Sequence, residues 1–236
     1  MNKSEEFVKI YNEIHEYMKE KKQVDNHRSF TRLIGETKEK DYIIKTYENY
    51  LIKFAQLRNI IVHENEIVAE PNDFSFSLIK KIRDKLINPP RVVPLFAKEV
   101  NTALAEDSIT EIIKLMSEKS YSKIPLVASN QQFIGLLTST AILKWLGEKE
   151  NQKSSGLLIN DIQARRILQY REKNHVFEFV DQNTKLIDII KKYDKMHRTG
   201  KSLEAFLITA DGSREKKIIG IITDRDIARV YRELEL

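Results

Sequence analysis

The chain has 236 residues, of which 41% are hydrophobic and 32% charged, a balance typical of a protein with a buried core and a solvated surface. The absence of cysteine excludes disulfides, thiolate metal sites and a cysteine nucleophile. No apolar run approaches the roughly 18 residues of a membrane span, and the first residues lack the apolar segment of a secretion signal. We therefore expect a cytoplasmic protein without a membrane partner.

The net charge of +5 invites a nucleic-acid interpretation, which the arrangement of the charges does not favour. Lysines alternate with glutamates along predicted helices, as in Lys19-Glu20-Lys21-Lys22, and such a mixed face is usually just solvated. The sequence contains no basic ribbon with interleaved aromatic residues of the kind that stacks single-stranded bases. We expect no nucleic-acid partner from the charge alone.

The first part of the chain, residues 1–88, is predicted to be a helical domain. Apolar residues recur at helical spacing over 4–22, 29–34, 39–62 and 74–87, with Ser29 as a cap and Gly35 as a terminator. The last of these helices must end at Asn88-Pro89-Pro90, because consecutive prolines cannot continue a helix. This point marks a domain boundary.

From Arg91 onward, short apolar strands alternate with helices in the order β-α-β-β-α, twice. The first copy, 91–147, is predicted to contain an extended segment and then helix, strand, strand and helix at 92–96, 109–119, 124–128, 133–137 and 140–146. The second copy, 156–236, repeats the order at 176–180, 186–197, 205–209, 217–222 and 227–234. Neither copy alone buries much surface, so we expect the two to pack together in an α+β fold.

The most informative motif is Gly220-Ile221-Ile222-Thr223-Asp224-Arg225-Asp226, an apolar strand that breaks into a helix. One interpretation is structural: Thr223 caps the helix and Asp226, three residues later, completes a capping pair. The other is functional, because a helix start with a hydroxyl suits a phosphate and a nearby carboxylate can accept from ribose hydroxyls. The same form occurs 85 residues earlier, at Gly135-Leu136-Leu137-Thr138.

The two copies resemble tandem CBS domains, the repeat that pairs into a Bateman module. The resemblance covers about residues 91–236 and rests on the β-α-β-β-α order, the Ile-Pro-Leu-Val strand at 124–127 and the closing Gly-x-x-Thr-x-x-Asp. It implies an adenine nucleotide between the repeats, with Thr223 on phosphate and Asp226 on ribose. Thr138 matches the motif, but Ala141 stands at the acidic position and cannot accept a hydrogen bond. One complete site and one weak, altered or empty site are expected.

The resemblance also implies an apolar contact for the adenine ring. The candidates, for which ordinary core packing is the alternative, are Val176, Phe177, Ala205 and Phe206. Arg225 is a candidate phosphate ligand, with a plain surface arginine as the alternative. Family members bind AMP, ADP, ATP, S-adenosylmethionine or cyclic di-AMP, and the sequence leaves the choice open. The resemblance implies a regulatory homodimer, not an enzyme, that senses a nucleotide and signals through its helical domain, its dimer or an effector protein.

A rival hypothesis comes from Arg58-Asn59-Ile60-Ile61-Val62-His63. These six residues resemble the Arg-Asn-x-x-x-His motif of HEPN domains, some of which are metal-independent ribonucleases. That resemblance implies that Arg58 binds phosphate and that His63 acts as acid or base, in a ribonuclease gated by the CBS pair. The alternative is a noncatalytic bundle for docking or dimerisation, in which both residues pair with nearby glutamates. The five histidines lack ligand spacing, so no metal site is expected.

Overall fold

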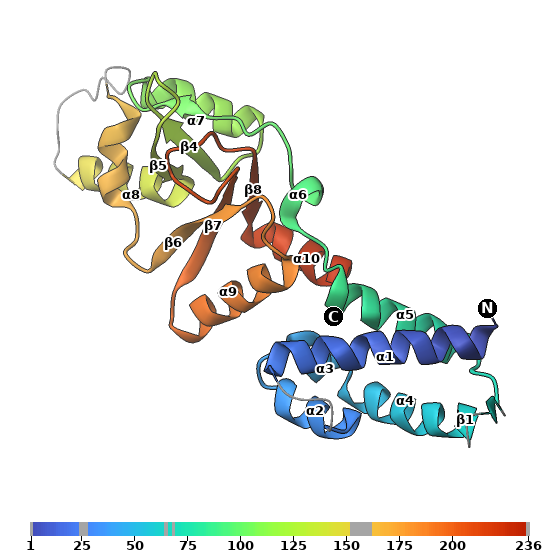
Figure 1. Ribbon diagram of the computed structural model, residues 1–236. Helices are drawn as coiled ribbons and strands as arrows, with labels where there is room; N and C mark the ends of the chain where they lie inside the picture. The colour runs from blue at the N-terminus through green and yellow to red at the C-terminus, as the bar shows by residue number, and fades with distance from the viewer. Residues whose placement is uncertain (1, 24–27, 64–65, 68, 152–161, 235–236) are drawn as a thin grey trace. The chain divides into compact units, whose positions relative to one another are not determined.

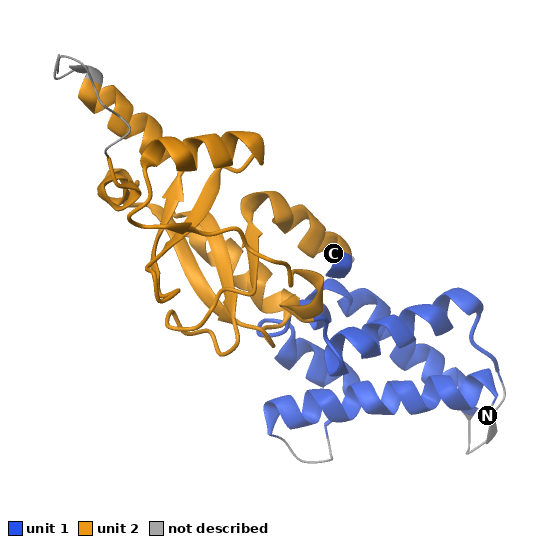
Figure 2. Ribbon diagram, turned by 90° about the horizontal axis from the view of Figure 1, so that it is seen from above, with its two compact units in different colours: residues 1–90, 233–236 blue, residues 91–232 orange. Residues whose placement is uncertain are grey.

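The computed structural model describes residues 2–23, 28–63, 66–67, 69–151 and 162–234. The chain divides into two compact units, coloured separately in Figure 2. Unit 1 contains residues 1–90 and 233–236, and unit 2 contains residues 91–232. Each unit has its own set of buried apolar side chains.

Unit 1 is a helical bundle with one short β-hairpin (Figure 1). Its elements are α1 (Lys3–Lys22), α2 (Phe30–Thr37), α3 (Tyr42–Thr46), α4 (Glu48–Ile61), β1 (Val62–His63), β2 (Glu66–Ile67) and α5 (Asp73–Ile87). Helix α1 packs against α2, α4 and α5. Apolar residues at helical spacing on α1 supply one wall of the core, namely Phe7, Ile10, Ile14 and Met18. Ser29 caps α2, and α5 ends at Ile87 before Asn88-Pro89-Pro90, both as predicted.

Two sequence-based boundaries in unit 1 are wrong. The single helix expected over 39–62 is broken at Tyr47, where the backbone leaves helical geometry at φ −102° and ψ 13°. Asp41 starts the separate helix α3, because its Oδ1 accepts from the N–H groups of Ile43 and Ile44 at 3.0 and 3.2 Å. Helix α2 continues past Gly35 to the buried Thr37, whose hydroxyl donates to the Leu33 carbonyl oxygen.

Unit 2 contains two three-stranded sheets (Figure 1). In one, β4 (Lys123–Val127) lies between the parallel β3 (Ala103–Leu104) and the antiparallel β5 (Phe133–Thr138). In the other, β7 (Ser202–Thr209) lies between the parallel β6 (His175–Asp181) and the antiparallel β8 (Gly220–Thr223). The helical elements are α6 (Val92–Leu95), α7 (Ile109–Glu118), α8 (Ser139–Asn151), η2 (Ala164–Tyr170), α9 (Leu186–Arg198), η3 (Asp224–Asp226) and α10 (Ile227–Leu234). The predicted fold class, helices followed by two β-α-β-β-α repeats, is confirmed.

The sheets pack face to face through one apolar cluster. Phe133 and Leu136 of β5 meet Ala205 and Leu207 of β7 and Ile221 of β8, all of them buried. The aromatic rings of Phe177 and Phe179 on β6 lie edge-on to Phe133, with centroids 5.3 and 5.1 Å away. Because each repeat covers the apolar face of the other, neither sheet needs a further layer on that side.

The first repeat departs from prediction at its start. Residues 92–96, expected to be extended, instead contain the turn α6, in which the Phe96 N–H donates to the Val92 carbonyl oxygen at 2.8 Å. Within this turn Val93 keeps extended geometry, at φ −102° and ψ 132°. The chain then runs along β8, where Lys98 N–H donates to the Ile219 carbonyl oxygen at 3.1 Å, and joins β4 only at Ala103. By contrast, β6 pairs with β7 from His175 to Asp181. The first strand of the first repeat, β3, is therefore much shorter than the first strand of the second repeat, β6.

The close approach of the chain to β8 requires glycine at position 220. A methyl group there would lie 2.3 Å from the Phe96 carbonyl oxygen and 2.9 Å from Ile208 Cδ1.

We therefore expect Gly220→Ala to lower the free energy of unfolding by about 1–3 kcal/mol. Gly35→Ala, which meets nothing within 4 Å in helix α2, should instead raise it by about 0.5–1 kcal/mol. Urea unfolding of the two variants measures both effects, and a neutral Gly220→Ala would contradict the packing described here.

Candidate functional site

A cavity of about 280 Å³ opens in unit 2 where β8 runs into η3. Three segments line it: residues 98–101 before β3, residues 120–125 at the start of β4, and residues 221–226 of β8 and η3. The first two segments belong to the first repeat and the third to the second repeat. The site is thus built by both repeats together.

Thr223 and Asp226 form one wall of this cavity and bond to each other. Asp226 Oδ2 accepts from Thr223 N–H at 2.8 Å and from Thr223 Oγ1 at 2.9 Å, and the Thr223 side chain accepts from the Asp226 N–H. The structural interpretation of the motif, a capping pair, is therefore realised. Asp226 Oδ1 has no hydrogen-bond partner among the described residues, so this carboxylate can still accept from a ligand hydroxyl.

Three cationic side chains line the cavity, and they differ in whether they have an ion-pair partner. Lys123 is engaged, with its Nζ 2.6 Å from Asp224 Oδ1 and 3.2 Å from Glu204 Oε2. Lys98 and Arg225 are exposed, and within the described part of the chain neither has an ion-pair partner. These two side chains are free to neutralise an anionic group beside the helix start.

The remaining lining of the cavity is mixed, with apolar side chains beside Glu99, Asn101, Ser120 and Ser122. Val100, Pro125 and Ile221 line it, and Val100 also packs against the cluster between the sheets. The Tyr121 ring lies at its edge with 37% exposure, and its hydroxyl accepts from Asn101 Nδ2 at 2.8 Å. Apolar walls beside a free carboxylate oxygen and two uncommitted cations suit a flat ring joined to a hydroxylated, anionic group.

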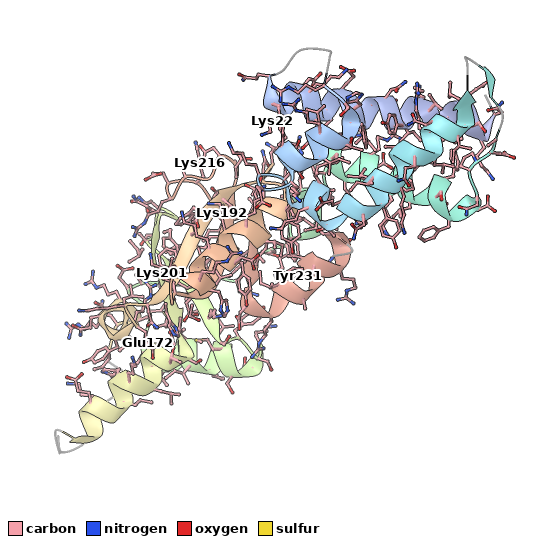
Figure 3. All side chains as sticks on the ribbon, turned by 90° about the horizontal axis from the view of Figure 1, so that it is seen from below. Lys22, Glu172, Lys192, Lys201, Lys216 and Tyr231 are labelled. Atoms are coloured by element: carbon pink, nitrogen blue, oxygen red, sulfur yellow. The ribbon has the colours of Figure 1, made fainter. Side chains whose placement is uncertain are left out.

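The structure brings together only part of the predicted site. Thr223, Arg225 and Asp226 share the cavity described above. Val176 and Phe177 line a different cavity of about 440 Å³, which Lys192, Lys195 and Lys201 also border (Lys192 and Lys201 are labelled in Figure 3). Ala205 and Phe206 are fully buried on β7, and although Ala205 pairs with Thr223 along the strands, its side chain lies in the core between the sheets.

Sequence reasoning missed the walls supplied by the first repeat. Lys98, Val100, Tyr121 and Pro125 lie far from Thr223 in the chain, and only the packing of the sheets brings them to it. The one sequence signal was the Ile-Pro-Leu-Val strand at 124–127, which includes Pro125. Pro125 lies in β4, the middle strand of its sheet, and lines the same cavity as Thr223 at the end of β8.

The corresponding helix start in the first repeat differs. Thr138 is 4% exposed, its Oγ1 accepts from the Ala141 N–H at 3.2 Å, and it lies 2.9 Å from Thr140 Oγ1. Ala141, which stands at the acidic position, is fully buried. This helix start is capped by a buried threonine and offers no carboxylate to a ligand.

The residues of the rival hypothesis lie on two elements. Arg58 is half-buried in the last turn of α4, whereas His63 belongs to β1 and its side chain lies outside the described residues. Over the described ranges, no group of three or more histidine or acidic side chains could hold a metal ion. None of the helices described here has the length and apolar character needed to cross a bilayer.

A model of the CBS domain matches the chain twice, at residues 93–148 and 171–233, which together make up half of its length. The chain belongs to the CBS domain family. The tandem CBS pair expected from the sequence is thereby confirmed. The cavity beside Thr223 lies between these two CBS domains, since residues 98–101 and 120–125 fall in the first match and residues 221–226 in the second.

Two curated relatives are archaeal homoserine O-acetyltransferases. That of Methanohalobium evestigatum is 22% identical over 198 residues, or 82% of this chain and 36% of that protein. That of Methanococcus vannielii is 21% identical over 138 residues, or 58% of this chain and 25% of that protein. The chain therefore spans about a third or less of the relatives it matches.

Several solved structures resemble part of the chain. The CBS domain pair of protein MJ0100, solved with 5′-methylthioadenosine and S-adenosyl-L-methionine, is 19% identical, with 61% of this chain and 98% of that chain covered and a TM-score of 0.44. CBSX2 in complex with AMP is 14% identical, with 62% and 99% covered and a TM-score of 0.45. A conserved protein from Pyrococcus horikoshii is 22% identical, with 61% and 93% covered and a TM-score of 0.44.

Proposed function

We propose that this CBS pair is a regulatory module that binds one adenine nucleotide per chain in the cavity beside Thr223. The observation that carries the proposal is the meeting, in one cavity between the two CBS domains, of apolar walls, a free carboxylate oxygen and two uncommitted cations. Each of these features matches one part of a nucleotide. Membership of the CBS family supports the same assignment.

The chemistry of each residue that lines the cavity suggests which part of the nucleotide it contacts. Val100, Pro125 and Ile221 pack on the adenine ring, and the Tyr121 ring covers its open edge. Asp226 accepts from a ribose hydroxyl through Oδ1. Thr223 supplies a hydroxyl to the phosphate, and Lys98 and Arg225 supply positive charge. The proposal thus replaces Val176, Phe177, Ala205 and Phe206 as adenine contacts with residues of the first repeat and Ile221.

The size of the cavity bears on the ligand. A volume of about 280 Å³ lies just below the roughly 300–1,000 Å³ of small-molecule sites. This favours a single nucleotide such as AMP over cyclic di-AMP, with ADP, ATP and S-adenosylmethionine between them in size. The second site is proposed to stay empty, because a ribose hydroxyl buried against Ala141 would be left unpaired at a cost of about 1–3 kcal/mol.

Regulation requires that the nucleotide prefer one arrangement of the chain over another. We propose three domains, at 1–88, 91–147 and 156–236. The first of these signals whether nucleotide is bound, either to an effector protein or through a homodimer.

An apolar groove of about 420 Å³ between α7 and α8 supports the homodimer. Leu143 in this groove is 66% exposed, and Ile113, Met116 and Leu146 lie beside it.

Substitution of Asp226 tests the site. We expect Asp226→Ala to weaken the binding of the preferred adenine nucleotide by about 1–3 kcal/mol, because a ribose hydroxyl loses its acceptor. The measurement is calorimetric titration of parent and variant with AMP, ADP, ATP, S-adenosylmethionine and cyclic di-AMP. Asp188→Ala is the matched control, since Asp188 also lies in the first turn of a second-repeat helix but does not line the cavity. Equal affinities for all three proteins would place the ligand elsewhere.

The ribonuclease hypothesis stays a prediction, and we do not propose it as the main function. Incubation of the parent, Arg58→Ala and His63→Ala proteins with single-stranded RNA tests it. The hypothesis expects cleavage by the parent and a loss of at least about a hundredfold in His63→Ala, because general acid–base catalysis contributes about that much or more. It also expects weaker cleavage by Arg58→Ala, because the phosphate loses its cationic partner. Absence of cleavage by the parent, or cleavage that survives both substitutions, would refute it.

A further inference from the structure

A continuous chain of polar side-chain contacts runs from the proposed nucleotide site into the second repeat. Lys123, at the wall of the cavity, contacts Asp224 at 2.6 Å and Glu204 at 3.2 Å. Glu204 Oε1 lies 2.5 Å from His175 Nδ1, and His175 Nε2 lies 2.9 Å from Glu172 Oε2. All of these residues belong to unit 2.

The centre of this chain is buried, which makes its charge balance important. The side chains of Glu204 and Lys123 are only 6% and 11% exposed. A buried carboxylate is stable only with its charge compensated, and Glu204 has two compensating groups, Lys123 on one oxygen and His175 on the other. Any change in the charge of His175 must therefore alter how strongly Glu204 holds Lys123.

The contacts of His175 depend on its protonation. A neutral imidazole donates from one ring nitrogen, whereas the charged form donates from both. Both ring nitrogens of His175 face carboxylate oxygens, so both contacts are hydrogen bonds only when the ring is protonated. The geometry thus matches an imidazolium clamped between Glu172 and Glu204.

Other charged groups around His175 come from each neighbouring element. Arg171, after η2, donates from Nη2 to the His175 carbonyl oxygen at 3.2 Å and lies over the Phe177 ring. Glu172, labelled in Figure 3, contacts Lys144 of α8 at 2.9 Å, and the hydrogen bond from Lys144, followed by the charge of His175, lowers the pKa of Glu172. Glu172 is therefore a carboxylate at neutral pH, and it faces His175 Nε2.

We propose that His175 and Glu204 are positioning residues for Lys123 and make the binding of anionic nucleotides depend on pH, an inference that rests on the proposed function. With His175 protonated, Glu204 is balanced from both sides and Lys123 stays beside Asp224 at the cavity. When His175 loses its proton, Glu204 draws Lys123 toward itself, and the cavity loses positive charge while Asp224 loses its partner. Both changes disfavour an anion, so affinity falls as pH rises.

The test uses two adenosine probes, one with an anionic group at the 5′ position and one without. Adenosine 5′-sulfate keeps a single negative charge across the range in which histidine titrates, about pH 5 to 8, whereas the phosphate of AMP itself titrates near pH 6. Adenosine is the uncharged probe. We expect the parent to bind adenosine 5′-sulfate about three- to tenfold more weakly at about pH 8 than at about pH 5.5, with little change for adenosine.

Three variants identify the source of the effect. His175→Gln, which keeps a donor but does not titrate, should bind the sulfate with the same affinity at both pH values. His197→Gln, the same change at an exposed histidine of α9, should keep the pH dependence of the parent. Glu172→Gln should move the midpoint of the effect to lower pH, because the imidazolium loses one of its two carboxylates.

The outcomes separate this inference from the proposed function. Affinity of the parent for the sulfate that does not vary with pH would overturn the role of His175 and leave the nucleotide site intact. Failure of the parent to bind either probe at either pH would overturn the proposed function, and this inference with it. If His175→Gln does not fold, Glu172→Gln decides, and an unchanged midpoint in that variant would overturn the inference.

Discussion

The packing of the two three-stranded sheets against each other is the constraint on which the candidate site depends. Phe133 and Leu136 from the first repeat and Leu207 and Ile221 from the second are buried in one apolar cluster. This contact fixes the start of β4 beside the end of β8, and it leaves the segment before β3 to run along β8 instead of β4. The cavity beside Thr223 is the space that this path encloses. Neither repeat could form it alone.

The two repeats share a fold, but they differ where a ligand would be held. At the second-repeat helix start, Asp226 keeps a free oxygen and the adjoining cavity is lined by exposed cations. At the first, Thr138 is buried and Ala141 is packed in the core. The same asymmetry places a histidine–carboxylate–lysine chain, buried at Glu204, on one side, reaching from His175 to the open cavity. The two repeats thus share an architecture, whereas the carboxylate and the adjoining cavity belong to the second-repeat helix start.

Much of the fold could be predicted because periodicity and capping are local. The helical spacing on α1, the Ser29 cap and the prolines after α5 each determine an element from a few neighbouring residues. The break at Tyr47 could not be predicted in this way, since the apolar spacing continues across it and the signal lies in the side chain of Asp41. Thr223 and Asp226 could be found from their motif, although nothing in the sequence shows that they also bond to each other. Val100 and Tyr121 could not be found, because they reach the cavity only through the packing of one repeat on the other.

We propose that an adenine nucleotide occupies the cavity formed by both repeats. A titration of isotopically labelled protein with AMP, followed by the backbone amide signals in NMR, tests this occupancy most directly. We expect the largest shifts to fall together on residues 98–101, 120–123 and 223–226, from both sides of the cavity. Shifts concentrated instead around Thr138, or in the separate cavity bordered by Val176, Lys195 and Lys201, would contradict it.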